Sequence, residues 1–150
     1  MIRDDIKAAT IAAMKSGDKD STTTLRMVSA AIKNRDIEAR TGNAPKDDDA
    51  LVTEVIQKMI KQRRESAEVY RKGGRDDRAA TEEQEIAVIE RFLPRQLSDD
   101  EAQAQIRAIV AETGASSMKD MGRVMALVKE RLGTSIEPAR ASALVKSALS

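Results

Sequence analysis

Four glutamates within nine residues come closest, in type and spacing, to the side chains of an acid–base or metal site: Glu82, Glu83, Glu85 and Glu90. Paired carboxylates transfer protons or hold cations when burial or a neighbouring charge shifts their pKa values. Acids in the first turn of a helix are also common, because they complement the positive end of its dipole. Nothing in the sequence marks these four as buried, so we expect a solvated helix face and no catalysis.

Histidine and cysteine are both absent from the chain. Their absence excludes the usual zinc ligand sets, disulfide bonds, and Ser-His-Asp and Cys-His nucleophiles. The sequence also lacks the glycine-rich loops that bind nucleotide phosphates, and we expect Gly73 and Gly74 only to form a turn. We therefore predict a protein that is not an enzyme and holds no metal and no cofactor. A carboxylate- or lysine-based active site is a minor alternative.

Positive charge gathers in one stretch of the first half of the chain. Seven cations stand there against Glu65 and Glu68, a local net charge of +5, although the whole chain carries only +1. Lysines and arginines in such a stretch can displace the counterions of a phosphate backbone. The alternative is a solvated face with pairs of opposite charge four residues apart. We call this stretch the second basic surface, because it is the weaker of two candidates. It comprises Lys58, Lys61, Arg63, Arg64, Arg71, Lys72 and Arg75.

Residues 117–150 are also basic, with six cations against Asp120, Glu130 and Glu137. Gly122 stands here inside an expected helix, where glycine costs about 1 kcal/mol relative to alanine. Close approach of another helix would explain this glycine, and so would close approach of a ligand. Packing alone favours the first explanation, with Met121 and Met125 in the core. The candidate residues for binding a nucleic acid are Lys119, Gly122, Arg123, Lys129, Arg131, Arg140 and Lys146.

The elements that must position these residues are all predicted to be helices. Hydrophobic residues make up 41% of the chain but aromatic residues only 1%, so the core must be aliphatic. Apolar positions repeat at helical spacing, and Ser98-x-x-Glu101 and Thr81-x-x-Gln84 are capping-box patterns. We expect an all-α fold whose helices span about residues 2–16, 21–41, 48–72, 81–93, 98–113, 117–132 and 138–149.

A break at Pro94 to Leu97 divides these helices into two groups, and we expect it to be a corner or a hinge. The chain is therefore predicted to form two helical lobes. Residues 1–96 would hold about four helices, and residues 97–150 would form a three-helix tail lobe.

Three stretches together resemble the GatB/YqeY family, in particular its stand-alone YqeY-like members, over essentially the whole chain. They are KQRRESAEVYRKGGR at residues 61–75, the segment from Glu82-x-x-Glu85 to Phe-Leu-Pro at residues 82–94, and MGRVM at residues 121–125. Residues 97–150 are also similar to the tail of GatB, a subunit of the tRNA-dependent amidotransferase. One departure is Arg78, where the family pattern shows a leucine.

The resemblance implies a role in translation. The tail of GatB helps to hold the tRNA of the misacylated substrate, and Gly122 and Arg123 match its glycine and basic position. A carbon–nitrogen ligase activity with glutamine as amido donor is not implied, because that chemistry belongs to a large domain and a further subunit that this chain lacks. The resemblance therefore suggests a non-catalytic tRNA-binding module.

The alternative is an accessory module that docks on an amidotransferase, an aminoacyl-tRNA synthetase or another translation protein through a helical face. A net charge close to zero suits this alternative better. We expect neither DNA nor a membrane as a partner, since no stretch approaches the roughly 18 apolar residues of a membrane span. The first residues, with two acids and no long apolar run, do not resemble a signal peptide. We predict a cytoplasmic location.

Overall fold

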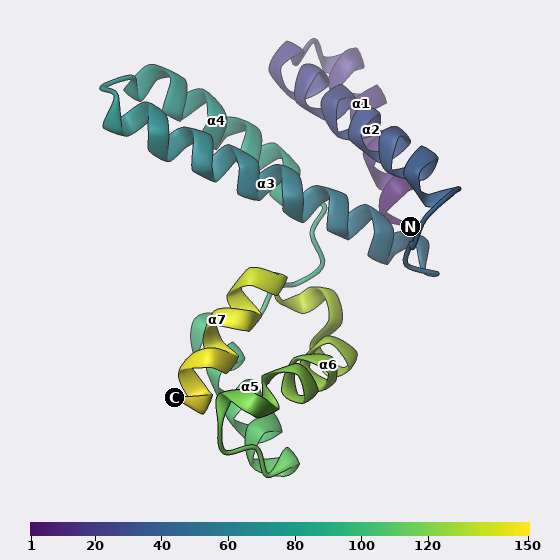
Figure 1. The fold of residues 1–150 in the computed structure, drawn as a ribbon. Coiled ribbons are helices and arrows are strands. Elements are labelled where there is room, and N and C mark those ends of the chain that lie inside the picture. Colours follow the sequence, from purple (N-terminus) through teal and green to yellow (C-terminus); the bar gives the residue numbers. More distant parts are fainter. The chain divides into compact units, whose positions relative to one another are not determined.

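The computed structural model describes residues 1–150 and confirms the all-α prediction, with seven α-helices and no strands (Figure 1). The chain divides into two compact units, Met1–Leu93 and Pro94–Ser150. Each unit has a hydrophobic core of its own. The helices are α1 (Ile2–Ser16), α2 (Lys19–Ala39), α3 (Asp48–Lys72), α4 (Asp76–Glu90), α5 (Asp99–Thr113), α6 (Met121–Leu132) and α7 (Pro138–Leu149).

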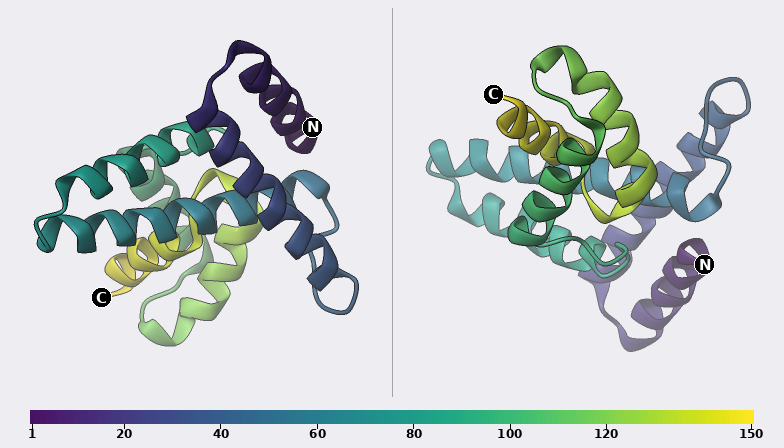
Figure 2. Two further views of the ribbon diagram at one scale, coloured as in Figure 1. Left: turned by 90° about the horizontal axis from the view of Figure 1, so that it is seen from above. Right: turned by 90° about the horizontal axis from the view of Figure 1, so that it is seen from below.

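Two helical hairpins build the N-terminal unit. Helices α1 and α2 pack against each other, and α3 and α4 do the same; Figure 2 shows α3 and α4 side by side in both of its views. Gly17 ends α1 with a φ of 74°, a conformation that suits glycine and lets its N–H reach the last carbonyls of the helix. The aliphatic core is formed mainly by Ile6, Leu25, Val28, Ile32, Val52, Ile56, Ile60 and Ile89.

The beginning of α1 is fastened by charged hydrogen bonds to α2 and α3. The Arg3 guanidinium donates to both carboxylate oxygens of Asp36 at 2.9 Å and to both of Asp48 at 2.9 and 3.2 Å. The backbone N–H of Ile2 donates to Asp49 at 3.0 Å. Forked guanidinium–carboxylate contacts are among the stronger polar contacts in proteins, so this cluster fixes where α1 begins.

Three helix starts differ from the sequence prediction. Helix α6, predicted from about residue 117, begins at Met121 after a short 3₁₀ turn at Met118–Asp120. Helix α2 begins at Lys19 because the Asp18 side chain accepts from Ser21 N–H at 3.1 Å; Thr22 and Thr24 then lie buried inside the helix. Helix α4 begins at Asp76, and Thr81 lies one turn inside it, where its hydroxyl donates to the Asp77 carbonyl at 3.2 Å. Serine and threonine cap a helix only when no earlier residue has already started it.

The C-terminal unit is a three-helix arrangement around its own aliphatic core. The predicted capping box at the start of α5 is confirmed: Ser98 Oγ accepts from Glu101 N–H at 3.2 Å, and Glu101 accepts from Ser98 N–H at 3.2 Å. Pro138 occupies the first turn of α7, as predicted. The buried side chains are Ala102, Ile106, Ile109, Val124, Val128, Ile136, Ala141, Val145 and Leu149.

Most of the segment predicted as a corner or hinge is bonded to the C-terminal unit. The Gln96 side-chain amide donates to the Thr134 carbonyl at 2.8 Å, and Leu97 N–H donates to the Ser135 carbonyl at 2.8 Å. Arg140 closes the same segment by donating to the Leu97 carbonyl at 2.9 Å. Gln96 and Leu97 are therefore integral parts of the C-terminal unit.

Candidate nucleic-acid interface

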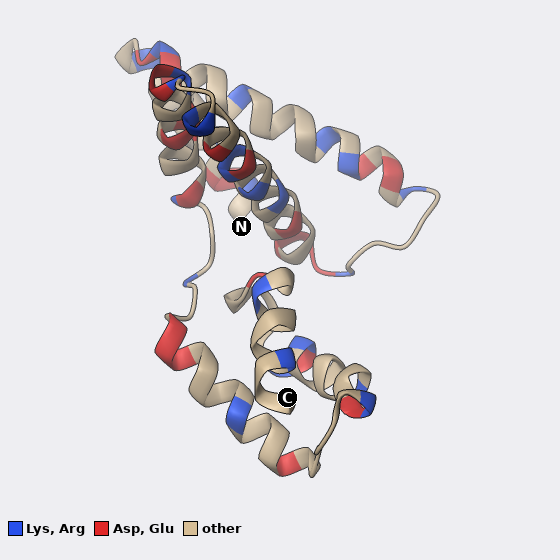
Figure 3. Cartoon of the chain, turned by 60° about the vertical axis from the view of Figure 1, so that its left-hand side comes forward, with Lys and Arg blue, Asp and Glu red and all other residues tan.

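The glutamates of α4 serve as partners for the cations of α3. Arg63 contacts Glu85 at 2.9 Å, Arg64 contacts Glu90 at 3.1 Å, and Arg71 is bonded to Glu83. Figure 3 shows Lys and Arg interspersed with Asp and Glu along the helices. Much of the charge of α3 is therefore balanced across the hairpin, which the sequence prediction of a basic surface did not anticipate.

Glu82 is the remaining acid of the four named from the sequence. It is half-buried, and burial raises its pKa above the ordinary value, with the nearby Glu85 carboxylate acting in the same direction. The Arg63 cation opposes this shift. In the whole chain, no group of three or more acidic side chains is arranged to hold a metal ion. Nor is any helix long and apolar enough to cross a bilayer.

The second basic surface is much weaker than its composition suggests. Arg63 keeps only 13% of its side chain exposed, Lys72 pairs with Glu68 at 3.2 Å, and Arg75 pairs with Asp77 at 3.3 Å. Lys58 and Lys61 are exposed and have no carboxylate partner. These two lysines are the cations of this surface that are most available to a phosphate.

Two of the tail arginines have structural partners. Arg140 is bonded to the Asp99 carboxylate as well as to the Leu97 carbonyl, so it holds the start of α5 against α7. Arg131, near the end of α6, is bonded to Glu112 of α5. The hydrogen bond from Arg131 lowers the pKa of Glu112, and the same bond raises that of Arg131. We therefore assign both arginines primarily a structural role within the unit, ahead of a role in ligand binding.

Gly122 lies at the second position of α6, where a Cβ atom would have no atom within 4 Å apart from its chain neighbours and the backbone of its own helix. Its exposure contradicts the interpretation that packing of another helix requires this glycine. Met121 and Met125, one and three residues away along the chain, do pack against the C-terminal core. The explanation that remains from the sequence is close approach of a ligand.

Exposed cations surround this open glycine. Lys119 lies in the short 3₁₀ turn before α6 and has no carboxylate partner. Arg123 keeps 59% of its side chain exposed and pairs with Asp120 at 3.3 Å. Lys129 lies seven residues after Gly122, hence two turns further along the same face, about 10 Å away. We call Lys119, Gly122, Arg123 and Lys129 the α6 surface.

Two cations of the C-terminal unit that have no carboxylate partner lie outside the α6 surface. Lys146, the last predicted candidate, is exposed on α7 and has no carboxylate partner. Arg107 of α5 was not predicted. It is the one arginine of the C-terminal unit without a carboxylate partner, since the other four all pair with an Asp or Glu of the unit. The one feature of the sequence that could have pointed to Arg107 is that it is the only charged residue between Ala102 and Val110.

Comparison with known proteins yields both a family and individual relatives. A family model described as "Yqey-like protein" matches residues 3–149. A protein of Eremothecium gossypii named "Altered inheritance of mitochondria protein 41, mitochondrial" is 35% identical over 92 residues, which are 61% of this chain and 46% of that protein. A protein of the same name from Vanderwaltozyma polyspora is 29% identical over 127 residues, 80% of this chain and 64% of that protein. An uncharacterized protein of Schizosaccharomyces pombe is 33% identical over 94 residues, 63% of this chain and 73% of that protein.

These relatives correct one prediction. The first two are named as mitochondrial proteins, and their names point to mitochondria and not to the cytoplasm that we predicted. A chain without cysteine suits any reducing compartment, so this criterion does not separate the two locations. The chain spans about half the length of the first relative and just under two thirds of the second. The similarity of residues 97–150 to the GatB tail is not part of these matches and stays a prediction.

Proposed function

We propose, from the premise that the chain belongs to the YqeY-like protein family, that it is a non-catalytic module that binds structured RNA, with tRNA as its ligand, through the α6 surface. The observation that carries the proposal is the open position at Gly122 between exposed cations. A missing side chain lets a sugar–phosphate backbone approach the first turn of α6, where the nearby cations favour phosphate.

The charges at this surface are easily redirected to a phosphate. The Arg123–Asp120 pair is exposed, and exposed pairs stabilise a fold by less than about 1 kcal/mol. Arg123 can therefore exchange the carboxylate for a phosphate oxygen at little cost, while Lys119 and Lys129 need to give up no partner. Aromatic stacking cannot contribute here, because the C-terminal unit contains neither tyrosine nor tryptophan nor phenylalanine. Binding must rest on backbone contacts and shape, as is usual for structured RNA.

The test is binding of the purified full chain to total tRNA at about 50 and about 200 mM salt, where three phosphate contacts predict a loss of affinity of roughly 40-fold. Arg123→Ala should weaken binding and reduce the slope of log affinity against log salt by about one. Arg26→Ala, which removes one exposed charge from α2, is the control and should bind as the wild type does.

Gly122→Ala separates binding from folding. Alanine fits the open position and favours helix, so the free energy of unfolding of the variant should be larger by about 0.5 kcal/mol. The variant should therefore unfold at a higher denaturant concentration. The same methyl group should weaken tRNA binding, because it occupies the space that the backbone of the RNA needs. A variant that is both more stable and unimpaired in tRNA binding would remove the role proposed for Gly122.

The rival function is an accessory module that docks on a translation protein. It is favoured by the pairing of Arg131 and Arg140 with Glu112 and Asp99, which leaves the tail unit less basic than its composition indicates. If the chain binds no tRNA even at low salt, while a protein partner is retained after nuclease treatment, this function replaces RNA binding.

A further inference from the structure

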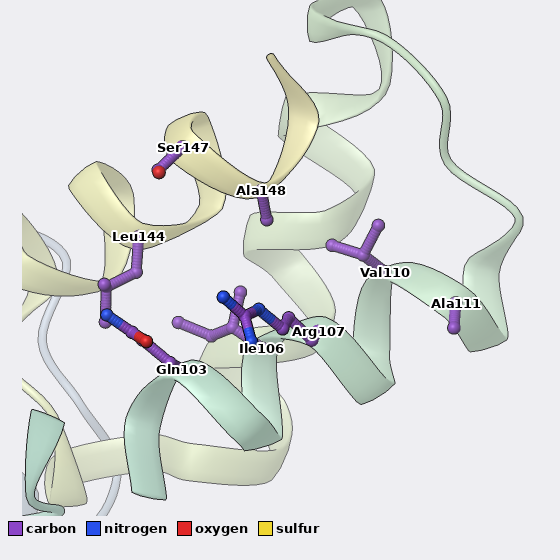
Figure 4. Close-up of a pocket in the computed structure, with 8 residues that line it drawn as sticks. All are labelled: Gln103, Ile106, Arg107, Val110, Ala111, Leu144, Ser147 and Ala148. Atoms are coloured by element: carbon purple, nitrogen blue, oxygen red, sulfur yellow. The ribbon is translucent and has the colours of Figure 1, made fainter. Parts of the chain in front are cut away.

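A groove between α5 and α7 in the C-terminal unit is distinct from the α6 surface. It has a volume of about 380 Å³ and is lined by Gln103, Ile106, Arg107, Val110, Ala111, Leu144, Ser147 and Ala148 (Figure 4). None of these residues belongs to the α6 surface, so a ligand could occupy the groove whether or not the chain binds RNA. We propose that this groove is a docking site for an amphipathic helix of a protein partner that carries an acidic residue opposite Arg107.

The spacing of the lining residues suits a helical occupant. Those on α5 stand at positions 103, 106, 107, 110 and 111, and those on α7 at 144, 147 and 148. Each set follows one helix face, and the α5 set extends over about 12 Å, two helical turns. A third helix packs its side chains between two such rows. At one end of the groove the small side chains of Ala111 and Ala148 allow the docked helix to approach closely.

The composition of the groove favours protein over nucleic acid. Its floor is apolar, since Ile106 is buried and Val110 and Leu144 are partly buried against the core. Phosphates would need several cations, whereas Arg107 is the only charged residue in the lining. Leucine-like side chains of a helix would cover the floor, and Gln103 and Ser147 would remain at the polar edge.

The positive charge of Arg107 determines which charge the partner helix must carry opposite it. Every other arginine of the unit is bonded to a carboxylate: Arg95 to Glu101, Arg123 to Asp120, Arg131 to Glu112 and Arg140 to Asp99. Arg107 has no such partner, and Figure 4 draws its side chain together with the other residues of α5 and α7 that line the groove. A guanidinium beside an apolar floor loses water when the groove is covered, so an occupant without an acid would bury an unpaired charge. An Asp or Glu on the docking helix removes that cost.

The experiment is a selection of displayed helices, randomised on one face of a stable helical scaffold, against the full-length chain. We expect the enriched helices to carry apolar residues three and four positions apart, with an Asp or Glu between them. Arg107→Glu should weaken their binding by about tenfold or more, and changing the selected acid to lysine should restore binding to the Arg107→Glu variant.

Lys146→Glu is the matched control, because it reverses an exposed charge on α7 outside the groove lining and should leave helix binding unchanged. The proposal is overturned if no helix is enriched, or if the enriched helices lack an acid. It is also overturned if Arg107→Glu dissolves a dimer of the chain, which would make a second copy the occupant. Loss of tRNA binding by Arg107→Glu, with no helix enriched, would assign the groove to RNA.

Discussion

Arg3 holds together three helix segments with a single guanidinium. It donates to Asp36 near the end of α2 and to Asp48, the first residue of α3, while it belongs itself to the first turn of α1. Its side chain is only 28% exposed, so water competes less for these bonds than at most surface pairs. The two acids raise the pKa of Arg3, and the bond from Arg3 lowers that of Asp36.

Arg3→Ala should lower the free energy of unfolding by about 1 kcal/mol at neutral pH, a value reduced for the partial exposure of both acids. Because the pKa of Asp36 is lower in the folded than in the unfolded chain, its contribution is complete above the ordinary value of 3.8. It disappears as the pH falls from there through the lower folded value. Urea unfolding should therefore show the difference between wild type and variant shrinking as the pH falls below 3.8.

Lys7→Ala on the same helix is the control for this effect. Lys7 is exposed and has no partner, so the variant should match the wild type at every pH. A constant difference between Arg3→Ala and the wild type from neutral to acid pH would show that packing of the Arg3 side chain, and not its charge, is what matters.

Pairing between helices is the part of the candidate sites that the sequence could not supply. Positive residues of α3 and tail arginines were identified from the sequence, yet Arg71 finds Glu83 and Arg131 finds Glu112 only because of how their helices pack. Charge counts along the chain do not contain this information. The open space around Gly122 has the same origin, since a sequence shows a glycine but not what stands next to it.

Helix α5 illustrates an element whose start is determined locally. Ser98 and Glu101 satisfy each other's backbone N–H groups, and three acids stand in its first turn. Ser98→Ala should remove one of these bonds and cost about 1 kcal/mol of stability, measured by denaturant unfolding. Ser116→Ala, at a serine whose hydroxyl makes no bond, is the matched control. Equal stability of the two variants would mean that the cap adds nothing to the start of α5.

The sequence was reliable for elements whose limits depend on neighbouring residues only. The bounds of α1 and the start of α5 were predicted because Gly17 and Ser98 act within a few residues. The start of α4 was misplaced because Thr81 has the pattern of a cap, whereas Asp76 and Asp77 already begin the helix after a turn at Gly74. Helix propensity cannot choose between two possible starts; packing of Ala79 into the interior does.

At the scale of the whole molecule, the chain has two aliphatic cores with no buried residue in common. Ile106→Ala should cost about 2–5 kcal/mol and affect the C-terminal core. Ile89→Ala should have a similar cost in the N-terminal core. We expect circular dichroism to resolve two unfolding steps in either variant, with the step of the altered unit at lower denaturant. A single shifted transition in both variants would instead show that the two units unfold together.

Tyr70 has an optical consequence. It is the only tyrosine of a chain without tryptophan, and it stands near the closed end of the α3–α4 hairpin, with the Arg78 guanidinium 5.9 Å from its ring centre. Tyrosine emission from the unmodified protein therefore reports on that hairpin alone, while residues 94–150 are silent at the same wavelengths. Absorbance near 280 nm therefore reports on the N-terminal unit. An unfolding step that appears in the peptide-bond signal, but not in the signal of Tyr70, belongs to the C-terminal unit.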